Sequence, residues 1–348
     1  MSPYMMTTLL ISMGLGTMVT FSSTHWLLAW MGLEINTLAI IPIMAKTHHP
    51  RAIEASIKYF ITQVTAATML LFASTTNAWF SGQWDIQQMS QPLPTTMIIL
   101  ALALKIGLAP LHIWLPEVLQ GLDLTTGLII STWQKLAPFA LLLQVQQTSP
   151  HLLTILAITS TIIGGWGGLN QTQLRKILAY SSIAHLGWMV LIIQFSPQLT
   201  LLTLLIYIIM TFAMFTTLRI NKAMSINMLS IVWTKAPILT SLTPLILLSL
   251  GGLPPLTGFT PKWLILQELT KQNLTFVATT IALTALLSLY FYLRLSYSTT
   301  LTTSPNNLVS TTQWRYYPLQ MTLPLTTSTI LTILLLPMTP LIMPLLIL

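Results

Sequence analysis

The sequence contains no cysteine, and charged residues make up only 6% of its 348 positions. The absence of cysteine excludes disulfide bonds, thiolate metal sites and iron–sulfur ligation by this chain. Because a soluble domain carries roughly a quarter charged residues, the scarcity of charge also excludes an ordinary soluble enzyme. The chain has no phosphate-binding glycine loop, no HExxH zinc motif and no nucleophile triad. We therefore expect no bond-making chemistry by this chain alone.

Apolar residues dominate what is present, at 54% of the chain with a mean hydropathy of +0.77. Apolar segments follow one another end to end, each long enough to cross about 30 Å of hydrocarbon as a helix of about 20 residues. The sequence therefore predicts an all-α polytopic membrane protein with one transmembrane domain over residues 1–348. We expect no cleavable signal or Arg-rich transit peptide before the first span. This pattern indicates synthesis beside the protein's own membrane, in a bacterium or an organelle.

Hydropathy predicts about eleven membrane-spanning helices. Their expected ranges are 3–21, 25–44, 57–77, 95–119, 124–146, 151–170, 175–195, 199–219, 237–271, 274–296 and 322–346. The ninth range is too long for one straight crossing, and glycines and prolines between Gly251 and Pro261 interrupt it. We expect a broken helix there.

The cations in the predicted loops are distributed unevenly between the two sides of the membrane. Ten lie on the side of the N-terminus, namely Lys46, Arg51, Lys58, Arg175, Lys176, Arg219, Lys222, Lys235, Arg294 and Arg315, and the opposite side has Lys271 alone. The positive-inside rule then places the N-terminus on the matrix or cytoplasmic side and the C-terminus opposite. The net charge of +8 comes without a basic run interleaved with aromatics, which favours anionic lipid over nucleic acid.

Three lysines and one acid fall inside predicted spans: Lys105, Lys135, Lys262 and Glu34. An ionisable side chain within the membrane is costly and usually marks an ion or proton pathway. Snorkelling explains these lysines poorly, because each lies about ten residues from at least one span boundary. Lys262 follows a helix break, so capping of freed carbonyl groups is an alternative role for it.

Two histidines are weaker candidates for proton transfer. His185 lies in mid-span, four residues after Ser181 and three after Ser182, and these three side chains form one polar helical face. An interhelical hydrogen bond explains this face about as well as a proton relay does. His112 lies just after Pro110, and a structural role is equally open for it.

A short repeat links the two places where helices should break. The segment "GLAPLHIWLPEVL" (107–119) aligns with "GLPPLTGFTPKWL" (252–264), and the identical residues include the glycine and two prolines. Broken helices at corresponding positions are typical of inverted-repeat transporters, which predicts repeat elements around 95–119 and 237–271. Pro110 cannot donate a hydrogen bond to the carbonyl of Ile106, so water can enter beside Lys105.

Four segments carry a family resemblance over essentially the whole chain. "LKIGLAPLHIWLPEV" and "RKILAYSSIAHLGWM" resemble two signatures of the antiporter-like membrane subunits of respiratory complex I and of multisubunit sodium/proton antiporters. "HHPRAIEASIKYFITQ" and "GLEINTLAIIP" are similar to a short animal mitochondrial form of these subunits. The resemblance implies an antiporter-like architecture that lacks the three N-terminal helices of longer members.

The resemblance also implies a function and an assembly. It implies a core membrane-arm subunit of proton-pumping NADH:ubiquinone oxidoreductase in the mitochondrial inner membrane, with the N-terminus in the matrix and the C-terminus in the intermembrane space. The expected partners are the other membrane-arm subunits and anionic lipid such as cardiolipin, without nucleic acid. The chain itself is expected to bind no cofactor, with FMN, Fe–S clusters and ubiquinone held by other subunits.

By the same resemblance, Glu34 and Lys105 form a pair, Lys135 continues a polar axis, and Lys262 lies in the second broken helix. His185 and His112 complete the expected set of proton-translocation residues. We hypothesise that opening of the Glu34–Lys105 pair releases a proton from Lys105 to water near Pro110. The alternatives are a static ion pair, a subunit of a sodium/proton antiporter, and a passive membrane scaffold.

Overall fold

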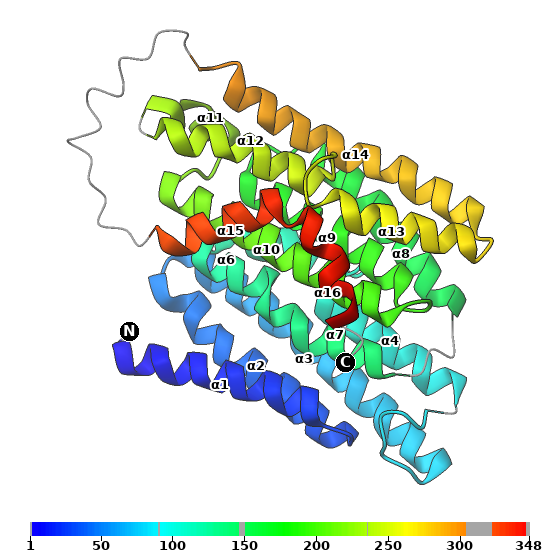
Figure 1. Cartoon of the computed structure of the whole chain (residues 1–348). Coiled ribbons are helices and arrows are strands. Elements are labelled where there is room, and N and C mark those ends of the chain that lie inside the picture. The colour runs from blue at the N-terminus through cyan, green and yellow to red at the C-terminus, as the bar shows by residue number, and fades with distance from the viewer. Residues whose placement is uncertain (1, 90, 146–149, 235, 304–321, 346–348) are drawn as a thin grey trace. The chain divides into compact units, whose positions relative to one another are not determined.

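The computed structural model describes residues 2–89, 91–145, 150–234, 236–303 and 322–345, which form helices joined by loops (Figure 1). The predicted all-helical class is confirmed, since these ranges hold no strand beyond two isolated antiparallel bridges, His25–Asp85 and Gln173–Ser225. A helix pairs its own backbone groups, which suits apolar segments in a medium without water.

The chain divides into two compact units, residues 1–159 and 160–348. The first unit contains α1 (Pro3–Ser22), α2 (Trp26–Met44), α3 (Pro50–Ser81), α4 (Pro92–Ile106), α5 (Trp114–Gly121), α6 (Leu124–Ser131), α7 (Trp133–Gln144) and the first half of α8 (Pro150–Gly168). The second contains the rest of α8, α9 (Leu174–Ile192), α10 (Pro197–Asn221), α11 (Ile226–Ile231), α12 (Pro237–Gly251), α13 (Phe259–Lys271), α14 (Thr275–Thr300), α15 (Leu323–Leu334) and α16 (Thr339–Leu345).

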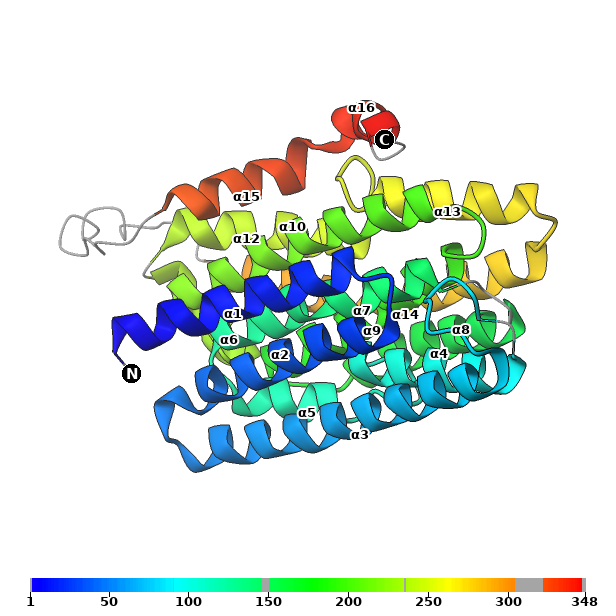
Figure 2. The same ribbon diagram turned by 90° about the horizontal axis from the view of Figure 1, so that it is seen from below.

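Within the first unit, α1 and α2 run side by side (Figures 1 and 2). Their backbones approach closely at two glycines, because a Cβ atom on Gly32 would lie 2.9 Å from the carbonyl oxygen of Gly16. Small residues at such crossings are typical of helix packing in membranes. The long helix α3 packs against α2, α4 and α5, and Figure 2 shows α5 lying along it. This packing positions α2, α4 and α7 around the polar residues described below.

Within the second unit, α12 lies beside α14, and α10 lies beside α15 (Figure 1). The helix α9 contacts both α10 and α14, and α13 contacts α14 and α10. The arrangement places the second broken helix, α12–α13, beside the helix that carries His185.

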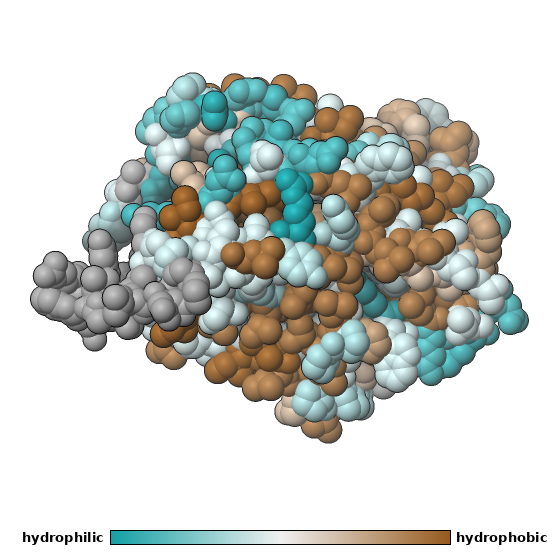
Figure 3. All heavy atoms as spheres, turned by 90° about the horizontal axis from the view of Figure 1, so that it is seen from above, coloured by the Kyte–Doolittle hydropathy of each residue, from teal (hydrophilic) through white to brown (hydrophobic). Residues whose placement is uncertain are grey.

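Seven described helices are long and apolar enough to cross a membrane, or eight when the bent pair α15–α16 counts as one span. The two halves of that pair meet at an angle of 70°. Large apolar side chains on these helices are exposed, including Tyr4 at 82% and Trp79 at 88%. Figure 3 shows such apolar side chains over broad areas of one face. This surface suits contact with lipid. α4 and α12 have 15 residues each, too few to cross alone.

Both predicted helix breaks are confirmed, and their boundaries repeat at a spacing of 145 residues. α4 ends at Ile106 and α5 begins at Trp114, while α12 ends at Gly251 and α13 begins at Phe259. The residue after each first half is a glycine with positive φ, 87° at Gly107 and 77° at Gly252. Only glycine adopts this conformation readily, and it is a common helix end.

The backbone hydrogen bonds at the two helix ends repeat as well. Leu108 donates to the carbonyl of Ala103 over 2.9 Å, and Leu253 donates to the carbonyl of Leu248 over 3.2 Å. The repeat found in the sequence is therefore present in the local backbone of both units.

The structure adds details that the predicted spans did not include, although Leu124–Gln144 still counts as one candidate membrane span. The range 124–146 contains an interruption at Thr132, whose hydroxyl and backbone N–H both bond to the carbonyl of Leu128. A threonine that bonds back one turn competes with continuation of the helix. The range 322–346 bends between α15 and α16, and α3 extends to Pro50–Ser81. Lys235 and Arg315, two of the predicted loop cations, lie outside the described residues.

Candidate proton-transfer sites

Lys105 lies in the last turn of α4, directly before the break that Gly107 begins. It is 6% exposed, and its Nζ atom has no hydrogen-bond partner in the part of the chain that the structure describes. The carbonyl oxygen of Lys105 is 3.5 Å from Nε2 of Gln63 on α3. A buried ammonium group without a partner loses its hydration, which makes Lys105 the most unusual cation of the first unit.

Glu34 lies on α2 and is partly buried. The hydroxyl of Thr37 donates to its Oε2 over 3.1 Å and to its backbone carbonyl over 2.9 Å. Glu34 is close enough to Lys105 and to Tyr59 for Coulombic interaction, but no ion pair within 4.0 Å joins it to a lysine of the described ranges. The structure brings Glu34 and Lys105 into one neighbourhood in an open arrangement. The closed pair stays a prediction.

A small cavity lies beside Lys105. Its polar lining consists of Asn36 and Thr37 from α2, Gln63 from α3, Lys105 from α4 and Gln134 from α7. It has room for about one water molecule. Sequence reasoning missed Asn36. The available signal was an amide in an apolar span, two residues after Glu34.

Lys135 lies in the first turn of α7, just after the interruption at Thr132. Its side chain is 5% exposed. The neighbouring Gln134 points toward α2, where its Nε2 atom donates to the carbonyl of Asn36 over 3.4 Å. The first unit therefore holds two buried lysines, each at a place where a helix is interrupted.

His112 lies within the first break and is partly buried. Its Nδ1 atom is 3.3 Å from the carbonyl oxygen of Pro110. The indole N–H of Trp114 donates to the carbonyl of Leu104 over 3.1 Å. Trp114 thus donates a hydrogen bond to a carbonyl group near the end of α4. An interrupted membrane helix needs such donors, because the carbonyl groups at its end lack backbone partners.

In the second unit, Lys262 lies in the first turn of α13 and is partly buried. Its Nζ atom donates to the carbonyl of Gly251, the last residue of α12, over 2.6 Å. Lys262 therefore spans the break and binds a carbonyl at the helix end, as the alternative reading of its sequence suggested.

His185 lies on α9 between two buried tyrosines. Its Nε2 atom is 3.5 Å from the hydroxyl of Tyr292, and its ring centroid is 5.7 Å from that of Tyr207. The tyrosines are in turn hydrogen-bonded to serines of α9, Tyr292 to Ser181 and Tyr207 to Ser182. The predicted polar face of α9 is present, and it meets tyrosines that the sequence did not identify as its partners.

A second small cavity, with room for about one water molecule, is lined by His185, Thr203, Tyr207 and Lys262. The second unit thus brings His185 and Lys262 to one cavity. In the first unit, Lys105 shares its cavity with Asn36 and Thr37, which lie close to Glu34 on α2. Candidate residues that are far apart in sequence converge within each unit.

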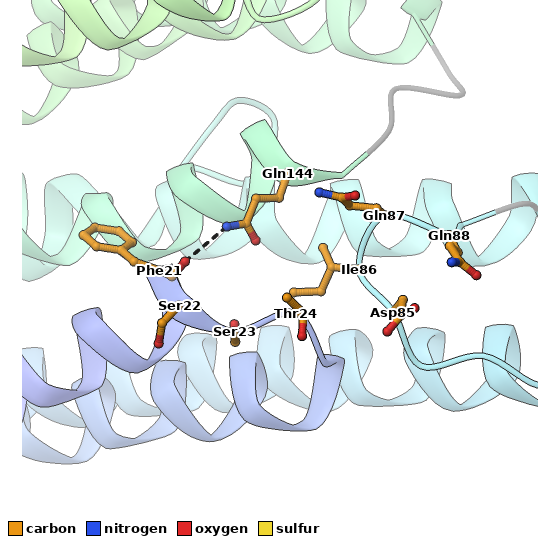
Figure 4. Close-up of a pocket in the computed structure, with 9 residues that line it drawn as sticks. All are labelled: Phe21, Ser22, Ser23, Thr24, Asp85, Ile86, Gln87, Gln88 and Gln144. Carbon is orange, nitrogen blue, oxygen red and sulfur yellow. Dashed lines mark hydrogen bonds between the residues drawn. The ribbon is translucent and has the colours of Figure 1, made fainter. Parts of the chain in front are cut away.

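Charged side chains of α3 and α5 form a cluster that is partly exposed. Lys58 contacts Glu54 over 2.7 Å and Glu117 over 2.8 Å, which links α3 to α5. An open hollow of about 400 Å³ lies at the end of α1 away from the N-terminus, where Figure 4 shows Asp85 and three glutamines around it. One of them, Gln144, donates to the carbonyl of Phe21 over 3.4 Å. Its polar lining contains no lysine or histidine.

The described ranges hold no group of three or more His, Asp or Glu side chains that could bind a metal ion. The whole sequence has no cysteine. The residues present therefore do not fit an iron–sulfur cluster, and we place no redox step in this chain.

Comparison with protein families gives two matches along the chain. Residues 23–288 match the family described as NADH:quinone oxidoreductase/Mrp antiporter, transmembrane. Residues 289–343 match the family described as NADH dehydrogenase subunit 2 C-terminus. The two matches are adjacent and together include every candidate site residue.

Similar proteins cover the chain almost completely. NADH-ubiquinone oxidoreductase chain 2 from Tetraodon nigroviridis is 71% identical over 340 residues, which is 98% of each chain. The protein of the same name from Carassius auratus is 66% identical over 346 residues, 99% of each chain.

Solved structures share the fold. A chain of respiratory complex I from Thermus thermophilus with bound aureothin superposes with a TM-score of 0.87 at 27% identity, covering 99% of this chain and 80% of that one. A chain of the Mrp complex from Dietzia sp. DQ12-45-1b has a TM-score of 0.84 at 16% identity, covering 97% and 76%. The second likeness shows the fold alone.

Proposed function

Because this chain belongs to the NADH:quinone oxidoreductase/Mrp antiporter transmembrane family, we infer that it is a membrane-arm subunit of proton-pumping NADH:ubiquinone oxidoreductase. The observation that carries this function is full-length identity of 71% to a chain of that enzyme. The chain contributes a proton path, and electron transfer from NADH to ubiquinone occurs in other subunits, which hold FMN and the Fe–S clusters. Its partners are the other subunits of the membrane arm.

We propose that six residues carry protons in this chain: Glu34, Lys105, Lys135, Lys262, His185 and His112. Support comes from the burial of Lys105 and Lys135, from a small cavity beside Lys105, and from a second small cavity that His185 and Lys262 line together. Proton hopping needs closely spaced groups and water, since no single side chain spans the gaps. Lysine suits this task because an arginine guanidinium does not deprotonate in proteins.

Lys105 and Glu34 form the proposed switch. Burial disfavours the ammonium form of a lysine, and a nearby carboxylate favours it. When the pair closes, Lys105 holds its proton. When it opens, the ammonium group faces the cavity beside the broken helix and yields its proton to water; the separation of Glu34 and Lys105 and the cavity at Lys105 support this proposal. Thr37 holds the Glu34 carboxylate in the open arrangement by one hydrogen bond.

The proposed architecture has eleven membrane crossings, with α4–α5 and α12–α13 as broken spans of an inverted repeat. The repeated helix bounds and glycine conformations support this proposal, and a shift of five spans, from the fourth to the ninth, would invert the second element because five is odd. The excess of loop cations near the N-terminal side supports a matrix N-terminus and an intermembrane-space C-terminus in the mitochondrial inner membrane. The same cations favour contact with anionic lipid such as cardiolipin.

The test of the proton path uses Lys105→Met and Glu34→Gln in the assembled complex, with protons moved per NADH oxidised as the measurement. We expect both variants to lower this ratio. Lys271→Met is the matched control, because Lys271 is an exposed lysine of the same chain whose partner is Glu268. Unchanged ratios and turnover in both variants would falsify the proposed role. Mitochondrial complexes that contain this chain but lack flavin and iron–sulfur subunits would instead favour a sodium/proton antiporter.

A further inference from the structure

Asn36 is a buried amide without a hydrogen-bond partner among the described residues. It is 1% exposed, and neither its Nδ2 nor its Oδ1 atom forms a hydrogen bond within those ranges. A buried amide normally binds protein groups or ordered water, because an unpaired donor and acceptor lose their hydration without compensation. The position therefore calls for a ligand with both hydrogen-bond donors and acceptors.

Asn36 lies between two neighbouring helices. On one side it lies against Gly16 of α1, where a Cβ atom would collide with its amide group. Its backbone carbonyl is bound by the Nε2 atom of Gln134, the residue directly before Lys135. Asn36 is thus held between α1 and α7, the helix that carries the second buried lysine.

Asn36 lines the same small cavity as Lys105, whose Nζ atom also has no hydrogen-bond partner within the described ranges. Two buried polar side chains without protein partners therefore border a space with room for about one water molecule. Water fits both groups, since it accepts from the ammonium group and both donates to and accepts from an amide.

We propose that Asn36 is a positioning residue, which holds a water molecule against the Nζ atom of Lys105 and so orients the acceptor of the Lys105 proton. This role rests on the proposed function of Lys105. Glu34 and Thr37 lie on the same helix, so a shift of α2 that closes the Glu34–Lys105 pair also moves the water. Asn36 couples the switch to the hydrogen-bonded water beside it.

The test replaces Asn36 with leucine, which has a similar size and no hydrogen-bonding group. Asn77→Leu is the matched control, because Asn77 on α3 is also fully buried with both amide atoms unpaired but does not line the cavity. Each variant is measured in the assembled complex for protons moved per NADH oxidised and for the effect of D₂O on turnover.

We expect Asn36→Leu to slow proton delivery by about tenfold or more and to raise the D₂O effect, because proton transfer becomes limiting without an oriented acceptor. Asn77→Leu should leave both quantities at their wild-type values. A loss of packing alone does not change a solvent isotope effect, so this readout separates positioning from structure.

A wild-type proton ratio and isotope effect in Asn36→Leu would overturn the role of Asn36, as would equal changes in both leucine variants. If Lys105→Met then still lowers the ratio, the proposed function stands without this inference. If neither leucine variant assembles, a high-resolution map of the wild-type complex decides. Density for water in contact with both Asn36 and Nζ of Lys105 supports the proposal, and a cavity without it refutes it.

Discussion

In α4–α5 the lysine precedes the helix break, and in α12–α13 it follows the break. The surrounding backbone is the same, since the helix bounds and the positive-φ glycines repeat at one spacing. The residue aligned with Lys105 is Leu250, and the residue aligned with Lys262 is Glu117. The repeat therefore determines where each helix is interrupted, but it does not determine where the lysines lie.

The two positions give the lysines different partners. Lys262 reaches back across the break and binds the carbonyl of Gly251, whereas Nζ of Lys105 has no hydrogen bond to any residue that the structure describes. A lysine after the break can point at the carbonyl end of the preceding helix, where positive charge is favoured. A lysine before the break points away from that end. Lys262 therefore holds its ammonium group in a hydrogen bond across the break, and the structure shows no such bond for Lys105 within the described ranges.

The largest expected contrast is in stability. Lys262→Met should destabilise the protein by about 1–3 kcal/mol, because it leaves a buried helix-end carbonyl without its donor. Lys105→Met should be neutral or stabilising, because it removes a buried ammonium group that has no hydrogen bond to another group of the described ranges. The measurement is the thermal transition of the assembled complex, with exposed Lys271→Met as the control. Equal losses of stability in the two variants would contradict the difference between the breaks.

Glycine-to-alanine changes sharpen the same contrast. Gly107→Ala and Gly252→Ala should each cost about 1–2 kcal/mol, because both residues have left-handed backbones. A Cβ atom on Gly107 meets Leu115 Cδ1 at 2.9 Å, while one on Gly252 meets Lys262 Cδ at 2.8 Å and Nζ at 2.9 Å. We therefore expect Gly252→Ala to displace Lys262 and lower protons moved per NADH, whereas Gly107→Ala lowers stability alone. A normal proton ratio in Gly252→Ala would show that the position of Lys262 is not critical.

The sequence was sufficient to predict the two breaks, because proline and glycine carry their backbone restrictions in their own chemistry. It also located Lys105, Lys135 and Lys262, since a charge in an apolar segment is conspicuous. The interruption at Thr132 was not predicted. It coincides with a hydrogen bond from the Thr132 hydroxyl to the carbonyl of Leu128. Because most threonines in membrane helices form such a bond without interrupting the helix, a threonine alone does not predict a break. The bend between α15 and α16 was signalled by Pro337, within a segment predicted as one span.

The partners of the candidate residues could not be predicted from spacing. His185 meets Tyr207 and Tyr292, which lie on two other helices, and Asn36 meets the cavity of Lys105 only after α2, α4 and α7 pack. Such contacts are tertiary, and an amide or a phenol in an apolar span has no periodic signal. The number of spans was obscured for a related reason, since short halves such as α4 and α12 count as crossings only together with the segments that continue them.

The smallest expected effect concerns Thr37, which holds the Glu34 carboxylate away from its proposed partner Lys105. Thr37 donates to Oε2 of Glu34 over 3.1 Å, so Thr37→Val removes one hydrogen bond from the carboxylate at almost constant shape. Loss of a bond worth about 1 kcal/mol should shift the Glu34–Lys105 equilibrium roughly fivefold toward the closed pair. Because the closed pair holds the proton on Lys105, turnover coupled to pumping should fall by a similar factor. Thr17→Val is the control, since its buried hydroxyl binds only the carbonyl of Gly14. Faster or unchanged turnover in Thr37→Val would mean that the open arrangement of Glu34 and Lys105 does not depend on Thr37. Lys105 and Lys262 would then differ only in the hydrogen bonds of their own Nζ atoms.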